Sequence, residues 1–508
     1  MPRPGAYPVR LVLQACVLAL GLTQPAAAAP DPQIIDLRKK IEALDTALNG
    51  GASLQVPNVD LVDKVGLTHV TKPEMFPALG AAYDWTATGN VLPEVERLDL
   101  RLALAMLAQT YGAKDNFDVI QAQGGDMDAL SIRKGVVTLP DLHKLLENNK
   151  FSSDLSPGGV TLKTPVIIWT DATLRLRPRE ILQLSRPDGA FIVVFGKIEI
   201  NGATVRSVGP QSVNSKDFVP FVTVTGGGSA HVANATFEDL GFGGEPKYSG
   251  FSIARNPLLP TTGEIHIENS VFDRVVSLAV NASRGATILG NKFHDTRGSS
   301  LIVSQSSDAR ILGNIFSGEA PTNGIRVLSG SARGVIRGNL LLNGERTGIA
   351  IRNASDQVLV ENNIVWSRGG GGITLTKTNC GLIQNNLVMD NKQKGIEIRT
   401  GLGNVVINNK IYKNRSAALF VSAQPHGALT VMRNNRLVGN QSGLATAEGE
   451  FVELEGNDFS RQFPRFLDGE LSSHTRHIAQ NMRGAERVVM TSFGPSDAPL
   501  NPFMCPER

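Results

Sequence analysis

Cysteine is scarce in this chain, and its scarcity excludes one class of fold. The 508 residues include three cysteines, and Cys16 lies in an N-terminal segment that we expect to be removed. The remaining pair, Cys380 and Cys505, cannot build the framework of several disulfides that holds small secreted domains together. One disulfide between these two residues is left open as an alternative to two free thiols.

An excess of charge of one sign is also missing. The chain carries 50 Lys and Arg residues against 47 Asp and Glu residues, a formal net charge of +3. Proteins that bind nucleic acid usually carry a strong basic excess that neutralises phosphates. We therefore do not expect nucleic acid as a partner.

The common catalytic signatures are absent as well. The sequence contains no Ser/His/Asp nucleophile signature, no HExxH run and no glycine-rich phosphate loop. Each of those motifs places reactive groups at a spacing that its chemistry requires. The sequence predicts neither a metal site nor a cofactor.

A continuous apolar run occurs only near the N-terminus, and it predicts a signal peptide over residues 1–29. Two arginines precede the apolar residues 11–22, and four alanines follow at 26–29. This order is typical of a secretory signal, and the run is too short to span a membrane. A lipoprotein box at 13–16 is the weaker alternative, because Gln14 fits it poorly. We expect a periplasmic mature protein that begins near Pro30 and has no transmembrane segment.

Asparagine pairs, in contrast, are abundant and regularly spaced. The second residue of each Gly-Asn or Asn-Asn pair falls at Asn291, Asn314, Asn339, Asn363, Asn386, Asn409, Asn435 and Asn457. The steps between them are 23, 25, 24, 23, 23, 26 and 22 residues. A period of this length is the signature of a solenoid.

Each repeat contains three short β-rich runs separated by turn residues. Thr287-Ile288-Leu289 precedes one pair, Lys292-Phe293 follows it, and Gly324-Ile325-Arg326-Val327 shows the run that begins at a recurring glycine. Such coils bury their apolar faces only by stacking, at the ~4.8 Å spacing of strands in a sheet. Asparagine tolerates left-handed turn geometry, and its amide can hydrogen-bond from coil to coil. The sequence predicts an all-β, right-handed parallel β-helix; a leucine-rich repeat lacks support because its leucine pattern is absent.

The predicted domain boundaries follow from where this repeat begins and ends. Helical apolar spacing at 34–48, 95–107 and 139–146 predicts an α-rich N-terminal cap over residues 30–150. The β-helix is expected over residues 151–465. For the tail, residues 466–508, a cap at the other end and disorder remain open.

Basic side chains recur on one predicted outer face. In the strand that begins at the recurring glycine, alternate residues point outward. The outward residues proposed to bind substrate are Arg326, Arg352, Lys377, Glu397 and Arg399. Arginine is well fitted to a planar carboxylate, so this face predicts an anionic polysaccharide as partner. The alternative is a solvated face balanced by acidic residues elsewhere.

Candidates for acid–base chemistry are few. His294 precedes Asp295 and could act as a base beside a carboxylate, although adjacent residues in a strand point opposite ways. Tyr248 could donate or accept a proton, and Arg326 could neutralise a substrate carboxylate. The alternatives are a surface-turn histidine and a packing tyrosine.

An ordered set of short motifs resembles the periplasmic mannuronan C5-epimerases of bacterial alginate systems. The motifs run from about Gly135 to Gln424. They include Leu139-Pro140-Asp141-Leu142, Ser156-Pro157-Gly158, Leu182-Gln183-Leu184-Ser185, Phe218-Val219-Pro220-Phe221, Tyr248 before Gly250, Gly290-Asn291, Asp295, and Gly395-Ile396 with Arg399. The resemblance implies a β-helix that epimerises a polyuronate beside other proteins of exopolysaccharide synthesis and export.

The catalytic signature of that family, Asp-Pro-His-Asp, has no counterpart here. The corresponding stretch is residues 300–307, and the Asp and His positions fall on Ile302 and Ser304. The family's arginine position falls near Ser329, with Arg326 close by, and an acidic position falls on Arg352.

Epimerisation and lyase chemistry both remove the C5 proton, and both need a neutralised carboxylate, a base and an acid. We therefore carry three hypotheses: an epimerase or lyase relative with a rearranged site, a non-catalytic polysaccharide-binding or export-guiding protein, and a neutral-sugar hydrolase. The hydrolase would need paired carboxylates facing one groove, and Glu397 has no obvious outward partner.

Overall fold

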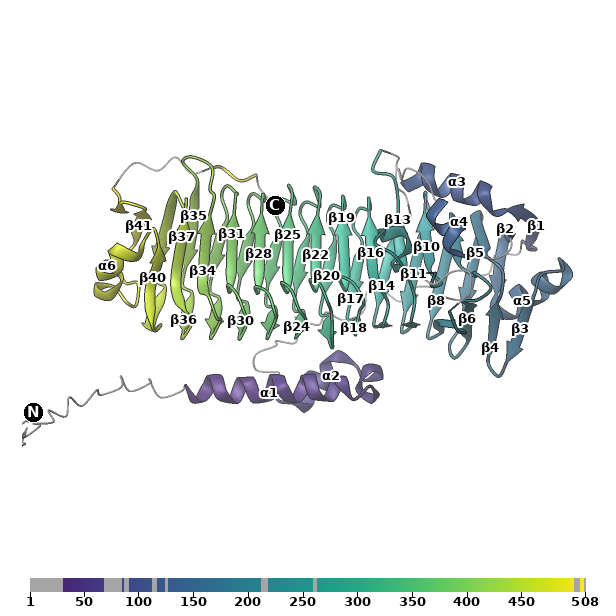
Figure 1. Ribbon diagram of the computed structural model, residues 1–508, viewed down its shortest axis with the longest axis horizontal. Coiled ribbons are helices and arrows are strands. Elements are labelled where there is room, and N and C mark those ends of the chain that lie inside the picture. The colour runs from purple at the N-terminus through teal and green to yellow at the C-terminus, as the bar shows by residue number, and fades with distance from the viewer. Residues whose placement is uncertain are drawn as a thin grey trace, which may run out of the picture.

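The chain forms an elongated solenoid of β-strands with helices at its ends and along one side (Figure 1). The computed structural model describes residues 31–67, 85, 91–111, 117–123, 127–211, 218–258, 263–497 and 503–506. The predicted signal peptide lies outside these residues. No helix within them is both long enough and apolar enough to cross a membrane.

Three columns of parallel strands build the solenoid, and each coil contributes one strand to each column. One coil runs through β16 (Ser277–Asn281), β17 (Thr287–Leu289) and β18 (Lys292–His294), and the next begins with β19 (Leu301–Ser304), which pairs in parallel with β16. We call the three columns the first, second and third faces. The predicted right-handed parallel β-helix is confirmed.

The first face consists of β7 (Ile192–Val194), β10 (Val222–Thr225), β13 (Gly250–Ala254), β16, β19, β22 (Ile325–Leu328), β25 (Ile349–Arg352), β28 (Ile373–Thr376), β31 (Ile396–Arg399), β34 (Ala417–Ser422), β37 (Ser442–Ala447) and β40 (Arg465–Gly469). The second face consists of β8 (Lys197–Asn201), β11 (Ser229–Ala233), β14 (Ile265–Glu268), β17, β20 (Arg310–Leu312), β23 (Val335–Arg337), β26 (Leu359–Glu361), β29 (Leu382–Gln384), β32 (Val405–Ile407), β35 (Leu429–Arg433) and β38 (Phe451–Glu455).

The third face consists of β3 (Ser153–Ser156), β4 (Gly159–Leu162), β6 (Ile181–Ser185), β9 (Thr204–Val208), β12 (Thr236–Glu238), β15 (Val271–Asp273), β18, β21 (Ile315–Ser317), β24 (Leu340–Leu342), β27 (Ile364–Trp366), β30 (Leu387–Met389), β33 (Lys410–Tyr412), β36 (Arg436–Val438) and β39 (Asp458–Arg461). The long strand β5 (Val166–Leu176) pairs with both β7 and β8.

Side chains that point inward stack coil upon coil into one core. Phe237, Phe272, Phe293 and Phe316 form a stack with ring centroids 4.9, 5.1 and 4.7 Å apart. The recurring glycines before the first-face strands are required by packing. A Cβ at Gly348, Gly372 or Gly395 would overlap an aliphatic side chain of the core.

The asparagine pairs are structural, as the sequence predicts. From Asn314 to Asn457 each Asn accepts, through Oδ1, hydrogen bonds from the backbone N–H and the Nδ2 of the preceding Asn in the series, and the Oδ1 of the first, Asn291, accepts from Ser270 N. The Oδ1 of Asn363, for example, lies 2.9 Å from Asn339 N and 3.0 Å from Asn339 Nδ2. The ladder satisfies backbone groups at the sharp turn between the second and third faces.

Two further ladders were not recognised in the sequence. Asn391, Asn414 and Asn440 stack between the third and first faces, each five residues after a member of the first ladder. Serines stack between the first and second faces, at Ser283, Ser306, Ser331 and Ser355. The second asparagine ladder could have been predicted from the sequence, because each of its members follows a member of the first ladder by five residues.

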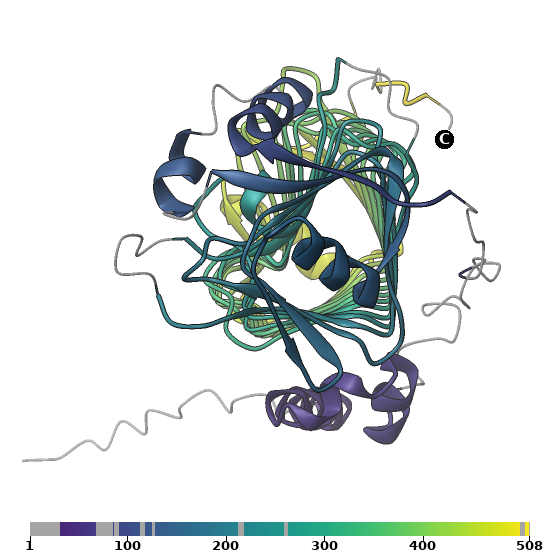
Figure 2. The ribbon, with the colours of Figure 1, turned by 90° about the vertical axis from the view of Figure 1, so that its right-hand side faces the viewer.

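Both ends of the solenoid are closed. At the N-terminal end, α5 (Leu139–Asn148) lies across the core (Figure 2) and buries Leu139, Leu142 and Leu146. Strand β2 (Asp128–Thr138) pairs with β5, and β1 (Glu94–Asp99) pairs with β2 in antiparallel fashion. Helices α3 (Leu100–Tyr111) and α4 (Phe117–Gln123) pack against the first face. The solenoid sheet therefore begins at β2, ahead of the expected boundary at residue 151.

The C-terminal tail forms a second cap. It contains η4 (Ser472–His474), α6 (Thr475–Gln480), β41 (Val488–Thr491) and β42 (Gly494–Pro495). Ile478 of α6 is buried in the core. A disulfide joins Cys380 to Cys505, which answers the question of their pairing.

The first helices do not belong to a cap, in contrast to the expected cap over residues 30–150. α1 (Pro32–Asn49), η1 (Ala52–Gln55) and α2 (Asn58–Lys64) lie along the third face (Figure 1), and we call residues 31–67 the strap. The physical reason is visible in β24, β27 and β30, where all three residues are apolar. A strand with no polar alternation is buried on both sides, so its outer side needs a cover.

Candidate functional site

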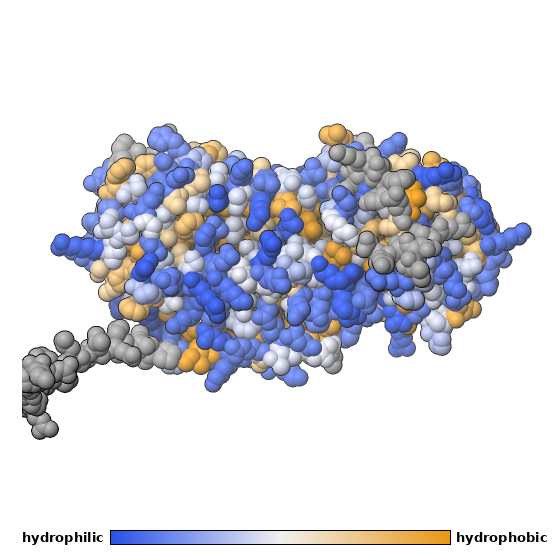
Figure 3. All heavy atoms as spheres, viewed as in Figure 1, coloured by the Kyte–Doolittle hydropathy of each residue, from blue (hydrophilic) through white to orange (hydrophobic). Residues whose placement is uncertain are grey.

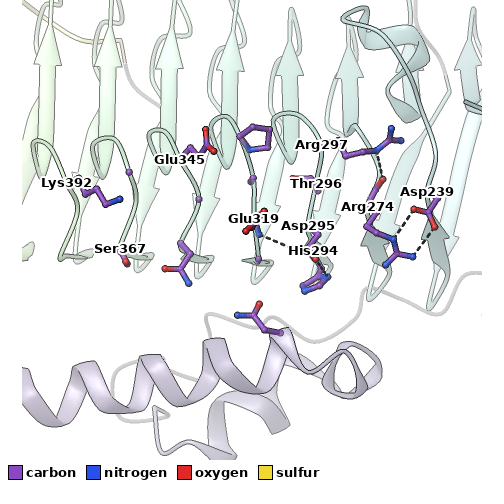
Figure 4. A pocket seen from close by; sticks show the side chains of 17 residues that line it. Asp239, Arg274, His294, Asp295, Thr296, Arg297, Glu319, Glu345, Ser367 and Lys392 are labelled. Atoms are coloured by element: carbon purple, nitrogen blue, oxygen red, sulfur yellow. Dashed lines mark hydrogen bonds and ion pairs between the residues drawn. The ribbon is translucent and has the colours of Figure 1, made fainter. Parts of the chain in front are cut away.

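A groove runs along the corner between the third and first faces, with the strap as its other wall (Figure 4). Its volume is about 1240 Å³. Turns from successive coils line it, and the lining residues that matter below are Asn49, Asp239, Arg274, His294, Asp295, Arg297 and Asn343. Along the chain, the turns that line the groove lead directly into first-face strands.

His294 lies in this groove and is held by a carboxylate from the preceding coil. Its Nδ1 is 2.9 Å from Asp273 Oδ1 and 3.5 Å from Asp295 Oδ2. Nε2 has no hydrogen-bond partner among the described residues. The hydrogen bond that Nδ1 donates to Asp273 raises the pKa of His294, against the opposing effect of burial. A carboxylate that holds one ring nitrogen and leaves the other open is suited to proton transfer.

The carboxylate nearest to His294 was not foreseen from the sequence, although the suggested neighbour Asp295 also lies close. Asp295 is adjacent in the chain, whereas Asp273 is 21 residues earlier and in register with His294 across the β15–β18 pair. Parallel stacking of coils brings the two side chains to the same side of the sheet. The sequence signal for this pair is that Asp273 and His294 occupy equivalent positions of successive repeats.

Asp273 also belongs to a wider charged network at this end of the groove. Arg274 contacts Asp273 and donates to both carboxylate oxygens of Asp239, at 2.9 and 3.0 Å. Arg297 donates from Nη2 to the carbonyls of Leu240 and Gly241, at 2.9 and 2.8 Å. Burial lowers the pKa of Arg297.

The strap adds a buried carboxylate beside the groove. Asp45 of α1 is 9 % exposed and accepts a 2.6 Å hydrogen bond from Asn343 Nδ2. Burial raises the pKa of Asp45. The strap therefore contributes polar groups to the groove wall as well as apolar cover.

Tyr248, a predicted acid or base, is packed inside an aromatic cluster. Its side chain is 1 % exposed and stacks on Phe242 with ring centroids 5.2 Å apart. Phe221 lies on it at 5.0 Å. This burial places Tyr248 in a packing environment outside the described groove, and its catalytic role stays a prediction.

Four basic side chains lie on the outer side of the first face, and we call them the lane: Arg326, Arg352, Lys377 and Arg399. Arg326 is in register with Ala350, and Arg352 is in register with Thr376 and then Arg399. Lys377 directly follows β28. None of the four forms an ion pair with a described residue. Figure 3 shows hydrophilic residues spread across the middle of this side of the molecule.

Arg326 is the most enclosed member of the lane. Its Nε is buried and has no hydrogen-bond partner among the described residues. Burial, with a smaller effect of the neighbouring Arg352 charge, lowers its pKa. A half-buried guanidinium without a carboxylate is costly unless a ligand or ordered water satisfies it.

Glu397, in contrast, is already neutralised within the protein. It forms a 2.9 Å ion pair with Lys394, whose ammonium lies 4.0 Å from the centroid of the Phe420 ring. The proposed direct role of Glu397 in substrate binding is thus less favoured than that of the lane.

The positions that correspond to the family's catalytic Asp and His are on the same face. Ile302 and Ser304 are in register with Arg326 and Leu328. Among outward residues of β16 through β31, Glu397 is the one carboxylate, and neither histidine nor tyrosine occurs. Within the described residues, no three His, Cys, Asp or Glu side chains are placed to hold a metal ion.

Comparison with protein families identifies the solenoid directly. The family described as "Right handed beta helix region" matches residues 198–365, 275–427 and 323–465. These overlapping matches cover the coils that carry both the groove and the lane.

Two curated relatives are similar to parts of this chain. A mannuronan C5-epimerase of Pseudomonas putida is 25% identical over 309 residues, covering 48% of this chain and 58% of the relative. The mannuronan C5-epimerase AlgG of Azotobacter vinelandii is 30% identical over 173 residues, covering 30% of this chain and 32% of the relative. The chain thus spans 58% and 32% of the lengths of these relatives.

Among solved structures, the fold is similar to that of the periplasmic alginate epimerase AlgG. The TM-score is 0.55 at 18% identity, and the match covers 77% of this chain and 92% of that chain.

Proposed function

Because this chain belongs to the right-handed β-helix family and resembles the mannuronan C5-epimerases, we propose that it binds a uronate-containing exopolysaccharide along the lane. The observation that carries the proposal is a set of four cations, one on each of four successive coils, that form no ion pair within the part of the chain that the structure describes. Successive coils are ~4.8 Å apart, a spacing comparable to one sugar unit of a linear polymer. Each uronate carboxylate can therefore meet one cation.

The proposed site of action is the periplasm, beside proteins that synthesise and export the polymer. Three observations support export: the signal-like N-terminal sequence, the Cys380–Cys505 disulfide, and the similarity to a periplasmic epimerase. Disulfides persist in oxidising compartments such as the periplasm and are rare in the cytosol.

C5-epimerisation is the second candidate function, and the His294–Asp273 pair favours it. A positioned imidazole with one free nitrogen can take or return the C5 proton, while an arginine of the lane neutralises the carboxylate. The pair lies in the groove beside the first face and not at the family's catalytic positions. A non-catalytic binding protein is the alternative, because the first face itself carries no imidazole and no unpaired carboxylate.

Substitution of the lane arginines tests the binding proposal. Arg326→Ala, Arg352→Ala and Arg399→Ala should each weaken polymannuronate binding by about 1.5–3 kcal/mol, the range for a hydrogen bond to a charged group. The loss should be smaller in high salt for the exposed Arg352 and Arg399. Calorimetry with wild-type and variant protein measures both effects.

Arg133→Ala is the matched control, because Arg133 is an exposed arginine of the cap that pairs with Glu96 at 3.0 Å. Its affinity for the polymer should equal that of the wild type. If none of the three lane variants changes affinity for any polyuronate, the lane is not the binding surface.

Solvent deuterium entering C5 of the polymer tests epimerisation separately. His294→Gln should abolish the exchange if the groove pair carries out the proton transfer. Binding without any exchange by the wild type would favour the non-catalytic alternative.

A further inference from the structure

We infer that the lane is closed at its N-terminal end, so that it receives a terminus of a polyuronate chain and not an internal stretch. The inference rests on the proposed binding function and adds the direction from which the polymer enters. It comes from a change in burial along the first face and from the segment that causes this change.

Outward side chains of the first face are all buried on β10, β13 and β16, whereas most of those on the later coils are at least partly exposed. Thr223, Ser252 and Ala279 are 0, 1 and 1 % exposed, although they point outward from β10, β13 and β16. From β19 onward most outward residues are at least partly exposed, and Arg352 and Arg399 are exposed, although Ala350 and Thr374 are 0 and 7 % exposed. The lane therefore opens after β16.

The cover is the segment 240–249, which carries η3 (Pro246–Tyr248), and we call this segment the wall. Ser252 Oγ donates to Lys247 O at 2.9 Å, and Thr223 Oγ1 donates to the same carbonyl. The hydroxyls of two successive coils are thus used to hold the wall directly over the line that a polymer would follow. Figure 4 shows this loop and its helical turn rising from Asp239.

Backbone hydrogen bonds attach the wall to the coils on either side. Ser277 N donates to Ser249 O at 2.6 Å, Val276 N donates to Leu240 O at 3.0 Å, and Gly241 N donates to Pro220 O at 2.7 Å. Gly241 has φ +91°, and a Cβ there would overlap Ser249 and Gly250. Such dense bonding is that of a fixed element and not of a mobile loop.

Two side chains strengthen the wall at its edges. Tyr248 is buried between Phe221 and Phe242, which anchors the wall to the aromatic cluster beneath α3. Arg297, one coil further on, binds Leu240 O and Gly241 O and fixes the edge that faces the groove. A polymer that lies on all four cations of the lane therefore meets a rigid barrier beyond Arg326.

Stoichiometry distinguishes the two ways of binding. A long polymannuronate is mixed with excess protein, and the mass of the complex is measured by light scattering coupled to size-exclusion chromatography. Terminus binding predicts that one protein, or two if both termini fit, saturates each chain whatever its length. Internal binding predicts a number of bound proteins that grows with chain length, and this result would overturn the inference.

A chain-length series gives a second readout. Cutting the mean chain length by about a factor of ten at constant uronate concentration should raise the apparent affinity per uronate by about the same factor. An unchanged affinity per uronate contradicts terminus binding. Protein in which all four lane cations are changed to alanine measures binding that does not involve the lane, and this background is subtracted.

The design separates this inference from the proposed function. If neither short oligomers nor long polymers bind, the binding proposal itself fails. If short oligomers bind through the lane arginines and long chains carry many proteins, the lane binds uronates but the wall does not select termini.

Discussion

His294 is the residue whose environment differs most from a simple turn histidine. It is 8 % exposed, and it faces the carboxylates of Asp273 and Asp295 while the nearby Arg274 charge opposes its protonation. The hydrogen bond that His294 donates to Asp273 outweighs burial, so the pKa of His294 is raised in the folded protein. The raised pKa keeps this ring protonated to a higher pH than a free histidine, which favours a role as an acid.

A histidine with a raised folded pKa makes stability depend on pH. Its contribution is complete below the unfolded pKa of about 6.5 and is lost as pH rises through the folded pKa. Wild-type protein should therefore lose more free energy of unfolding between pH 6 and pH 9 than His294→Gln protein, as measured by denaturant titration.

His426 is the control for this measurement, because its side chain is fully exposed. His426→Gln should follow the pH dependence of the wild type. Equal pH dependence of the wild type and His294→Gln would show that Asp273 does not stabilise the protonated ring.

The asparagine ladder makes a second prediction at the scale of single residues. Asn363→Ala removes the acceptor for Asn339 N and Asn339 Nδ2 and the donor to Ile336 O at 2.9 Å. Each buried group left without a partner costs about 1–3 kcal/mol, so the variant should be less stable by at least about 2 kcal/mol. Thermal or denaturant unfolding measures the loss.

Gln441→Ala provides the comparison, since Gln441 is an exposed side chain in the same repeat region. Its stability should remain near that of the wild type. If Asn363→Ala and Gln441→Ala are equally stable, the ladder does not hold the coils together.

At the scale of elements, the strap has two roles: it covers the third face, and it forms one wall of the groove. Apolar residues on both sides of its interface are buried, and Arg38 donates from Nε and Nη2 to the two oxygens of Asp390 at 2.7 and 2.6 Å. Asn58 of α2 donates to Gly290 O and Gly313 O at 3.0 and 2.8 Å, beside the asparagine ladder. The strap is thus tied to specific coils along its length.

Loss of the Arg38–Asp390 pair should loosen the strap and leave the coils intact. Arg38→Ala should weaken strap docking by about 1 kcal/mol, because the pair is partly exposed. Hydrogen exchange of residues 32–49 should accelerate, while exchange of the first-face strands stays unchanged.

Lys40→Ala is the control on the same helix, since Lys40 pairs with Asp36 within α1 and not with the solenoid. Its exchange should resemble that of the wild type. Acceleration in the coils as well as the strap would mean that the two unfold together.

At the scale of the whole molecule, the Cys380–Cys505 disulfide ties the end of the chain to a coil 125 residues earlier. In an exported protein this bond should form fully, whereas cytosolic reductants keep thiols free. Protein isolated from the periplasm should resist alkylation at both cysteines without prior reduction. The same chain lacking residues 1–29, retained in the cytoplasm, should be alkylated at both, and mass spectrometry distinguishes the two. Free thiols in periplasmic protein would contradict this prediction.

Much of the solenoid could be predicted because its information is local. The repeat of 22–26 residues, the turn asparagines and the alternation after each glycine all lie within single coils, and stacking simply repeats them. For the same reason the outward placement of Arg326, Arg352 and Arg399 followed from their distance to the recurring glycine. Their role in binding stays a prediction.

The sequence by itself therefore determined the β-helix, its asparagine ladder and the face that carries the lane. Tertiary structure alone decided that Asp273 holds His294 and that Tyr248, itself part of the wall, is buried against Phe221. These two contacts join different coils, and spacing along the chain does not specify which side chains meet across them, whereas Lys394 and Glu397 pair locally, three residues apart. The strap is intermediate: three consecutive apolar residues in β24, β27 and β30 signalled a covered face, but only the fold showed that residues 31–67 provide the cover.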